Sequence, residues 1–203
     1  MLTLIVSLTV AAAPTAATPM GVVRTANDEV QTILKAEGAS VDQLSQKADI
    51  YIDFVELAKR ALGKEWPKLN KKQQDEFSTT MKELLRVSYA QKALVDGKNG
   101  PGVAYLGEKV TGAEAAVQTT IQIKKDTFPV EYKLFKADAK TPWKIYDVVT
   151  DGVSLVSTYA DQFRQLLAKK GFDGLLTTIK AKRDQLAANA ANPATDPTGT
   201  KGN

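Results

Sequence analysis

The sequence predicts an α+β domain in which helices and an antiparallel sheet occupy separate stretches of the chain. Three observations support this fold class. Before residue 97 and again after residue 154, apolar residues recur with a period near 3.6, as on one face of a helix. Between residues 103 and 149 the period changes to two, as in half-buried strands. The connections between these strands are short, which favours an antiparallel meander.

Three helices are expected at the start of the domain. The apolar stripes predict the first over residues 20–36 and the second over about 41–48. Asp53 is placed as the N-cap of a third helix over residues 54–62, because its side chain can accept a hydrogen bond from the first turn. Gly63 follows at the position where a helix commonly ends in a left-handed conformation.

The longest helix of the chain is expected next. Asn70, with Gln73 three residues later, resembles a capping box that opens it, and the glycine-rich residues 97–102 end it. Its apolar side chains near the 3.6-residue period are Phe77, Met81, Leu84, Leu85 and Leu94.

Four strands are then expected, over residues 103–110, 116–123, 130–135 and 143–149. In each of the last three, apolar side chains alternate with polar ones. In the fourth strand this alternation places Ile145, Asp147 and Val149 on the same face of the sheet. Gly152 is predicted to mark the end of the sheet.

The helical period returns after the sheet. An apolar stripe beginning at Leu155 predicts a helix that ends at Gly171. Asp173 is placed as the cap of a last helix that runs through Leu186. Residues 189–203 lack large apolar side chains and are expected to be disordered.

The N-terminus predicts an export signal. The first residues form an apolar run that is shorter than the ~20 residues a membrane-spanning helix needs. Small residues follow it, so we expect residues 1–17 to be a signal peptide cleaved after Ala17. No Lys or Arg precedes Arg24, and the charged start of a usual signal is therefore missing. An apolar arm without a targeting role is the alternative.

Residues 18–188 are expected to form a single domain, since this length suffices for one hydrophobic core. We divide it into a helical lobe over about 20–96 and a lobe of sheet plus C-terminal helices over about 103–188.

Composition argues against most kinds of catalytic site. The 203 residues include no cysteine and no histidine, and the net charge is +4. Without these side chains there is no zinc site of the usual kind, no thiolate nucleophile and no Ser–His pair. We therefore expect no enzyme, no metal and no cofactor. The small net charge, with few aromatic residues among the basic ones, does not favour nucleic acid.

Two local patterns leave catalysis open as an alternative. Asp147 and Asp151 lie four residues apart, which on a strand would place both carboxylates on one face for a small isomerase or hydrolase. Gly152 interrupts that strand, so structural roles at a sheet-to-helix corner are favoured. Ser154 follows in a run similar to a nucleophile elbow, but the second glycine is missing. We place Ser154 near the start of the next helix.

Several runs of residues resemble the MlaC family of periplasmic phospholipid-binding proteins. The first run is D-F-V-E-L-A-K-R-A-L-G at residues 53–63, followed by Trp66. The second and more specific run is W-K-I-Y-D-V-V-T-D-G-V-S-L-V at residues 143–156. The order and spacing of these and shorter matches agree with the family over residues 22–187.

The resemblance implies both a fold and a function. The fold is a strongly curved sheet that faces helices across an apolar cavity, related to nuclear-transport-factor-like folds. The function is that of a soluble periplasmic carrier of phospholipid. Such a carrier moves lipid between an outer-membrane lipoprotein complex and an inner-membrane ABC transporter complex. A hopanoid carrier of the same family is an alternative, and so is an interaction-mediating protein with a solid core.

A carrier of this kind needs an apolar cavity for its cargo. Two acyl chains hold about thirty methylenes, and at ~0.8 kcal/mol each their exposure to water costs on the order of 20–25 kcal/mol. On periodicity alone a closed core is the commoner outcome, and only the family resemblance favours a cavity. The candidate lining residues are Phe54, Leu57, Met81, Leu84 and Leu85 from the helices, Tyr105, Ile121, Tyr132, Leu134 and Tyr146 from the sheet, and Leu155, Tyr159 and Phe163 from the helix after it.

Basic residues are concentrated between Lys59 and Lys92. This segment holds nine basic and four acidic residues, a net charge of +5. Such a surface is suited to anionic partners or lipid headgroups. A solvated helix face without a partner is the alternative interpretation.

Overall fold

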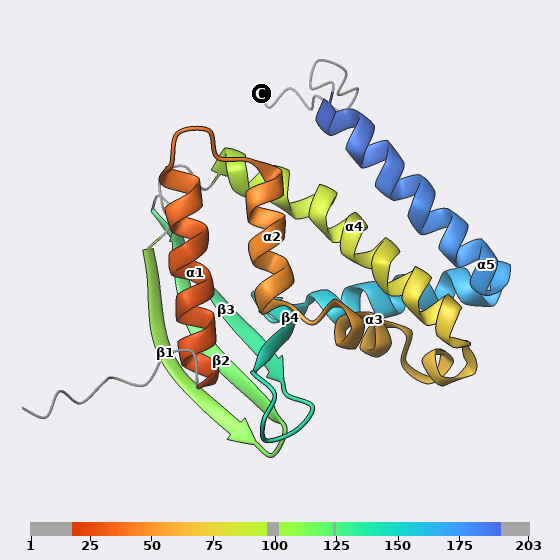
Figure 1. Ribbon diagram of the computed structural model, residues 1–203, viewed down its shortest axis with the longest axis horizontal. Coiled ribbons are helices and arrows are strands. Elements are labelled where there is room, and N and C mark those ends of the chain that lie inside the picture. The colour runs from red at the N-terminus through yellow and green to blue at the C-terminus, as the bar shows by residue number, and fades with distance from the viewer. Residues whose placement is uncertain (1–17, 97–101, 124, 192–203) are drawn as a thin grey trace, which may run out of the picture.

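The computed structural model describes residues 18–96, 102–123 and 125–191. Figure 1 shows a curved sheet with helices α1 and α2 on one side of the molecule and helices α3, α4 and α5 beside them. The elements in chain order are α1 Pro19–Lys35, α2 Val41–Tyr51, α3 Phe54–Leu62, the 3₁₀-helix η2 Gly63–Lys68, α4 Lys71–Asp96, β1 Gly102–Thr111, β2 Glu114–Ile123, β3 Asp126–Phe135, β4 Lys144–Thr150, β5 Val153–Ser154 and α5 Leu155–Ala191. The predicted signal peptide and the glycine-rich residues 97–101 lie outside the described residues.

The ends of helices α3 and α4 confirm the predicted caps. The Asp53 carboxylate accepts a hydrogen bond from the Glu56 backbone N–H at 2.9 Å. Gly63 ends α3 with φ +54°, a conformation that favours glycine. Asn70 and Gln73 each accept a hydrogen bond from the other's backbone N–H at 3.0 Å, which is the reciprocal geometry of a capping box.

Helix α2 is longer than predicted. It begins with a capping box between Ser40 and Gln43 and continues to Tyr51, three residues beyond Ala48. The added turn carries Ile50, whose side chain is exposed, so no apolar stripe marks it in the sequence. Leu44 is the only residue of α2 that is buried.

Helix α5 contains the predicted break at Gly171, where φ is +66° and the backbone is not helical. In Figure 1 the second half of α5 reverses direction there and runs along α4. Ion pairs of 2.5 Å join the two, from Lys180 to Glu76 and from Arg183 to Glu83. The helix continues to Ala191, so residues 189–191 are helical where we expected disorder. The remainder of the predicted tail lies outside the described residues.

The sheet is an antiparallel meander in the order β1-β2-β3-β4-β5. The prediction that the sheet ends at Gly152 is wrong. Asp151 and Gly152 have φ angles of +50° and +78° and form a two-residue turn that pairs Thr150 with Val153. Positive φ at both positions is typical of the hairpin turn that Asp-Gly favours. The α+β class and the antiparallel curved sheet are confirmed, with one short strand more than the four expected.

A bulge in β4 changes which of its side chains share a face. Asp147 pairs with Lys133 and Ile145 pairs with Leu134, so Tyr146 is the extra residue. Beyond the bulge the alternation is reversed, because the period of a strand is two. Ile145 therefore shares its face with Val148 rather than with Asp147, and the predicted face of β4 is wrong.

Packing divides the domain differently from the predicted lobes. One core lies between α1 and the sheet and includes Val22, Val23, Val117 and Leu134. The other core consists of residues from α3, α4 and α5, with Phe77 at its centre and fully buried. The first helix thus belongs with the sheet, and the C-terminal helix belongs with the other helices.

Arg60 of α3 connects the two cores. Its guanidinium stacks on the Tyr146 ring at 3.8 Å from the ring centroid and pairs with Glu56 at 2.8 Å and Glu114 at 2.7 Å. These contacts tie α3 to strands β2 and β4. Burial lowers the pKa of Arg60, but the ion pairs with both glutamates together outweigh it and raise the pKa above its ordinary value.

Candidate functional site

A cavity of about 670 Å³ lies between α2, α4 and strand β4. Its volume falls within the roughly 300–1,000 Å³ of ligand-binding pockets in proteins. The lining is mainly apolar and comes from the residues Val30, Leu44, Ser45, Ala48, Asp49, Ile52, Phe54, Leu57, Lys82, Leu85, Arg86, Tyr89, Ala90, Ala93, Ile145, Tyr146, Asp147, Val148, Thr150, Val153, Leu155 and Thr158. Tyr89 and Val153 are half or more exposed, so large apolar side chains reach the solvent at its edge.

Five of the thirteen candidate residues line this cavity: Phe54, Leu57, Leu85, Tyr146 and Leu155. Three candidates from the helices, Met81, Leu84 and Phe163, are buried in the helical core instead, and Tyr159 packs against them. Four candidates from the sheet are also absent from the lining: Tyr105, Ile121, Tyr132 and Leu134. A periodic pattern marks the buried face of an element but does not indicate whether that face meets other side chains or an open space.

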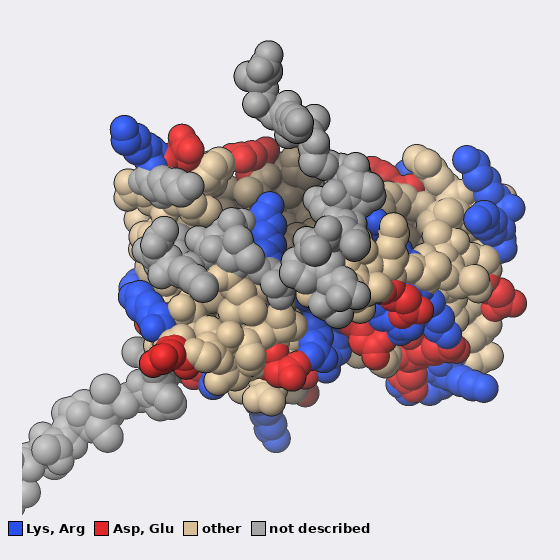
Figure 2. Space-filling view, turned by 90° about the horizontal axis from the view of Figure 1, so that it is seen from above, with Lys and Arg blue, Asp and Glu red and all other residues tan. Residues whose placement is uncertain are grey.

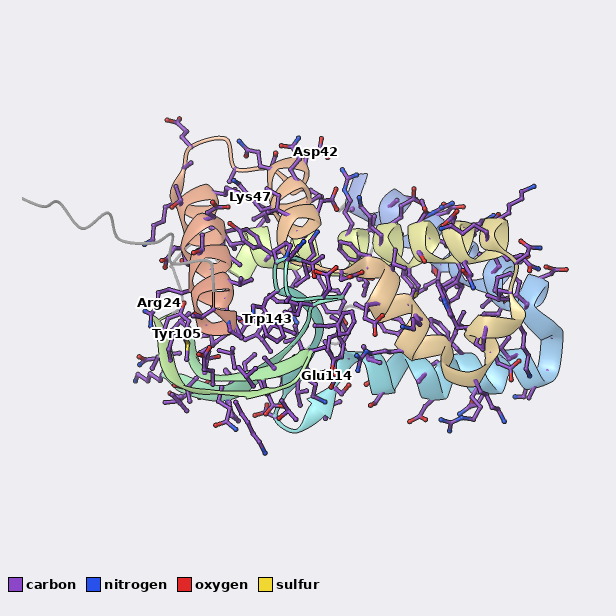
Figure 3. The ribbon with its side chains drawn as sticks, turned by 60° about the horizontal axis from the view of Figure 1, so that its bottom comes forward. Arg24, Asp42, Lys47, Tyr105, Glu114 and Trp143 are labelled. Carbon is purple, nitrogen blue, oxygen red and sulfur yellow. The ribbon has the colours of Figure 1, made fainter. Side chains whose placement is uncertain are left out.

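Helix α1 covers three of the sheet candidates, Tyr105, Tyr132 and Leu134. Asn27 of α1 donates a hydrogen bond to the Tyr105 hydroxyl at 3.3 Å and accepts one from the Tyr132 hydroxyl at 3.4 Å. Arg24 lies 4.0 Å from the centroid of the Tyr105 ring, and Figure 3 shows these two side chains together at one edge of the sheet. Leu134 is fully buried in the same core. This part of the sheet face is closed by protein.

Helix α4 presents two faces, and its large apolar side chains mark mainly one of them. The side chains of the first face enter the helical core, as Phe77 and Met81 do. The second face lines the cavity with the residues Lys82, Leu85, Arg86, Tyr89, Ala90 and Ala93. Their spacing of three and four residues follows the helical period. Because alanines and charged residues interrupt this stripe, Leu85 is the only one of its six residues among the candidates from the sequence.

Small side chains keep the cavity open. Helix α2 contributes Ser45 and Ala48, and α4 contributes Ala90 and Ala93. None of these side chains is long enough to fill the space between the two helices. The signal in the sequence is a pair of small-residue stripes at helical spacing, which is indistinguishable there from close helix packing.

Two ion pairs join α2 to α4 at the cavity. Lys82 pairs with Asp49 at 2.7 Å, and Arg86 pairs with Asp42. Figure 3 labels Asp42 at the start of α2. The Lys82 ammonium also lies 5.9 Å from the centroid of the Phe54 ring. All four charged side chains are 40% or more exposed, so each pair contributes only about 0–1 kcal/mol.

Asp147 forms a buried part of the cavity wall, and its carboxylate already has hydrogen-bond partners within the chain. It accepts hydrogen bonds from the Ser154 hydroxyl at 2.7 Å and the Val156 backbone N–H at 3.0 Å, and Lys133 lies 3.5 Å away. Ser154 in turn accepts from the Ser157 backbone N–H at 3.0 Å, which confirms its place at the start of α5. Asp147 thus secures the corner between sheet and helix, while Asp151 lies in the exposed hairpin turn.

Burial also perturbs tyrosines around the cavity. Desolvation raises the pKa of Tyr146, and the nearby Arg60 partly offsets this rise. Burial, followed by the neighbouring Tyr89, raises the pKa of Tyr159 to about 12. Both phenols are therefore neutral at physiological pH and act as apolar rings with a hydroxyl at one end.

The basic segment is largely paired within the chain. Six of its nine basic residues form ion pairs: Lys59, Arg60, Lys68, Lys71, Lys82 and Arg86. Figure 2 shows basic and acidic side chains intermixed over one face of the molecule. This pairing favours the interpretation of solvated helix faces over a separate cationic docking surface.

Two further kinds of site are absent from the part of the chain that the structure describes. No described helix is long and apolar enough to cross a membrane. No group of three or more Asp or Glu side chains among the described residues is arranged to hold a metal ion.

Comparison with known proteins identifies relatives. A protein from Haemophilus influenzae, "Intermembrane phospholipid transport system binding protein MlaC", is 26% identical over 139 residues, which is 66% of this chain. The match spans 64% of that relative's length. The solved structure of the phospholipid-binding protein from Ralstonia solanacearum, in complex with a phospholipid, is 26% identical and superposes with a TM-score of 0.74. The superposition covers 83% of this chain and 98% of the Ralstonia chain.

The model of the MlaC protein family matches residues 21–181, which run from the first turn of α1 into the second half of α5. Both runs that carry the resemblance lie inside this range, as do all residues that line the cavity. The chain belongs to the MlaC family.

Proposed function

We propose that this protein is a periplasmic carrier that binds a phospholipid by its acyl chains and moves it between the outer and inner membranes. The cavity of about 670 Å³ with its mainly apolar lining carries this proposal. The names of the relatives support it, since one is the binding protein of an intermembrane phospholipid transport system and the other is solved with a phospholipid.

The chemistry of the lining is suited to acyl chains. Transfer of each methylene from water to an apolar site is favourable by ~0.8 kcal/mol of free energy, whichever headgroup the lipid carries. Leu57, Ile145 and Val148 offer aliphatic walls, and Ala48 and Ala90 leave room between them. Affinity then comes mainly from chain burial, and the headgroup remains at the exposed edge near Tyr89.

Delivery requires a state with lower affinity for lipid. A partner can release the cargo only by stabilising a conformation that binds it less well. Helix α2 is the element best suited to this movement, since Leu44 is its only buried residue and exposed ion pairs hold it to α4. The partners are an outer-membrane lipoprotein complex and an inner-membrane ABC transporter complex.

Native mass spectrometry on protein exported to a bacterial periplasm tests the proposal. We expect bound mass in the steps of diacyl phospholipids, identified by solvent extraction and lipid analysis. A bound hopanoid would keep the carrier function and change the cargo. Protein that remains bare after incubation with phospholipid vesicles would contradict the proposal.

Asp147→Asn separates a carrier from an isomerase or hydrolase. Asparagine keeps the acceptor oxygen that the Val156 backbone N–H requires, but it cannot act as a general base. A carrier with this substitution still copurifies with lipid. Turnover of a small substrate that disappears in the variant would support the enzyme instead.

A further inference from the structure

Two cations stand out on the cavity wall. Of the described residues that line the cavity, Lys82 and Arg86 are the ones with a positive charge. They lie four residues apart on α4, so their side chains emerge on the same face of the helix, one turn from each other. Both side chains are part exposed, at 40% and 42%, which places them at the edge of the cavity rather than in its depth.

The partners of both cations are carboxylates of one weakly held helix. Asp49 and Asp42 of α2 accept from Lys82 and Arg86 respectively. All four side chains reach solvent, so an incoming anion can replace either carboxylate without leaving a buried charge unpaired. By contrast, Asp147, the remaining acidic residue of the wall besides Asp49, is buried and fully hydrogen-bonded.

We propose that Lys82 and Arg86 bind the phosphate of the cargo's headgroup, and that Asp49 and Asp42 hold these two cations in position when the cavity is empty. This inference rests on the proposed function. Guanidinium and ammonium groups form charge-assisted hydrogen bonds with phosphate oxygens, and the planar guanidinium can bind two of them. The apolar wall beside the pair, including Leu85, directs the acyl chains inward while the phosphate stays at the edge.

The pair therefore selects lipids that carry a phosphate. Both cations contribute to the binding free energy of a phosphodiester lipid. For a diacylglycerol with the same chains, only chain burial contributes. We expect the protein to prefer the phospholipid by about five- to tenfold, a modest factor because water screens part-exposed charges.

Uptake from vesicles measures this preference. Lipid-free full-length protein is incubated with phosphatidylcholine vesicles that contain diacylglycerol of the same chain length, and the bound lipids are extracted and quantified. We expect Lys82→Gln with Arg86→Gln to reduce phospholipid uptake about five- to tenfold and to leave diacylglycerol uptake unchanged. The matched control is Lys180→Gln with Arg183→Gln, which removes two cations from pairs between α4 and α5 and is expected to leave both uptakes unchanged.

The opposite substitutions distinguish phosphate binding from a structural brace. Asp42→Asn with Asp49→Asn removes the competing carboxylates and leaves the cations free, so phospholipid uptake should rise. If the ion pairs served only to hold α2, both double variants would change the uptake of both lipids in the same direction, and the inference would be overturned.

Two further outcomes are decisive. Wild-type protein that takes up phospholipid and diacylglycerol equally would overturn this inference and leave the proposed function standing, whereas uptake of neither would contradict the proposed function itself. An NMR titration with inorganic phosphate alone identifies the source of the anion. Shifts at Lys82 and Arg86 at phosphate concentrations comparable to those of the lipid would assign the pair to free phosphate instead of a headgroup.

Discussion

Helices α1 and α2 lie side by side in Figure 1, yet they cover the molecule in different ways. Helix α1 buries six of its residues, among them Val22 and Val23, against Val117 and Leu134 of the sheet. Helix α2 buries only Leu44 and extends over an open cavity. The first helix completes a core, and the second covers a cavity.

The size of the facing side chains explains the difference. Valines of α1 pack against aliphatic side chains of β2 and β3 in a buried cluster, and such interiors are usually close-packed. Beside α1, Ser45 and Ala48 of α2 line the cavity together with Ala90 and Ala93 of α4. Apolar surface that remains uncovered in this way is available to a ligand.

The largest expected effect is on folding. Val23→Asp places an unpaired carboxylate in the closed core, and we expect it to lower the free energy of unfolding by about 3–5 kcal/mol. Ala48→Asp on α2 is the matched control, because its carboxylate can reach the water of the cavity, and it should cost less than about 1 kcal/mol. Chemical denaturation checks both values. Equal losses would mean that the cavity is closed in solution.

The next largest effect is expected on the amount of phospholipid that the protein binds. Ala90→Trp fills the space between α2 and α4, and we expect it to reduce copurified phospholipid about tenfold with little loss of stability. Thr79→Trp adds the same side chain at an exposed position of α4 away from the cavity and should leave lipid unchanged. Lipid extraction and thermal denaturation measure the two quantities. Full lipid occupancy of Ala90→Trp would place the binding site elsewhere.

A smaller difference is expected in the local stability of the two helices. Amide hydrogens of α2 should exchange roughly tenfold faster or more than those of α1 in lipid-free protein, because few buried contacts oppose opening of α2. Bound lipid should slow the exchange of α2 and hardly affect α1. Hydrogen exchange with mass spectrometry resolves the helices as separate peptides. Equal protection of both helices in lipid-free protein would count against α2 as the mobile cover.

The smallest effect appears only at alkaline pH. Because the pKa of Tyr159 is raised to about 12 in the folded protein from its ordinary value of 10.0, folding favours the neutral phenol. Its stabilisation is complete below pH 10 and is lost as pH rises toward 12. Tyr159→Phe should therefore lose less stability than wild type between these pH values in urea denaturation. Identical pH dependence of both proteins would mean that the phenol is solvated.

The sequence predicted most elements because local chemistry determines their ends. Asp53, Asn70 and Gly171 mark helix boundaries through side-chain caps or backbone conformation, and the structure agrees at each. The hairpin turn at Asp151 and Gly152 is also encoded locally, since Asp-Gly is a strong hairpin signal, but a glycine after a strand equally indicates the end of a sheet.

The cavity was harder to predict because it depends on what faces each stripe. Leu84 and Leu85 are adjacent apolar residues of the same helix and both are buried in the helical core, yet only Leu85 also borders the cavity. The bulge at Tyr146 reversed the face of Val148, and no sequence pattern marks that bulge. Large apolar residues indicate burial, whereas an open space is formed by alanines whose partners are known only in three dimensions.

Photo-crosslinking with a phospholipid that carries a diazirine in one acyl chain shows directly where the cargo lies. We expect adducts in the cavity-lining parts of α2, α4 and β4, at residues such as Ala48, Ala90 and Val148, and none at Val23 or Val117 beneath α1. Peptide mass spectrometry locates the adducts. Cross-links concentrated between α1 and the sheet, or no specific cross-links in protein that carries lipid, would contradict the claim that this cavity holds the cargo.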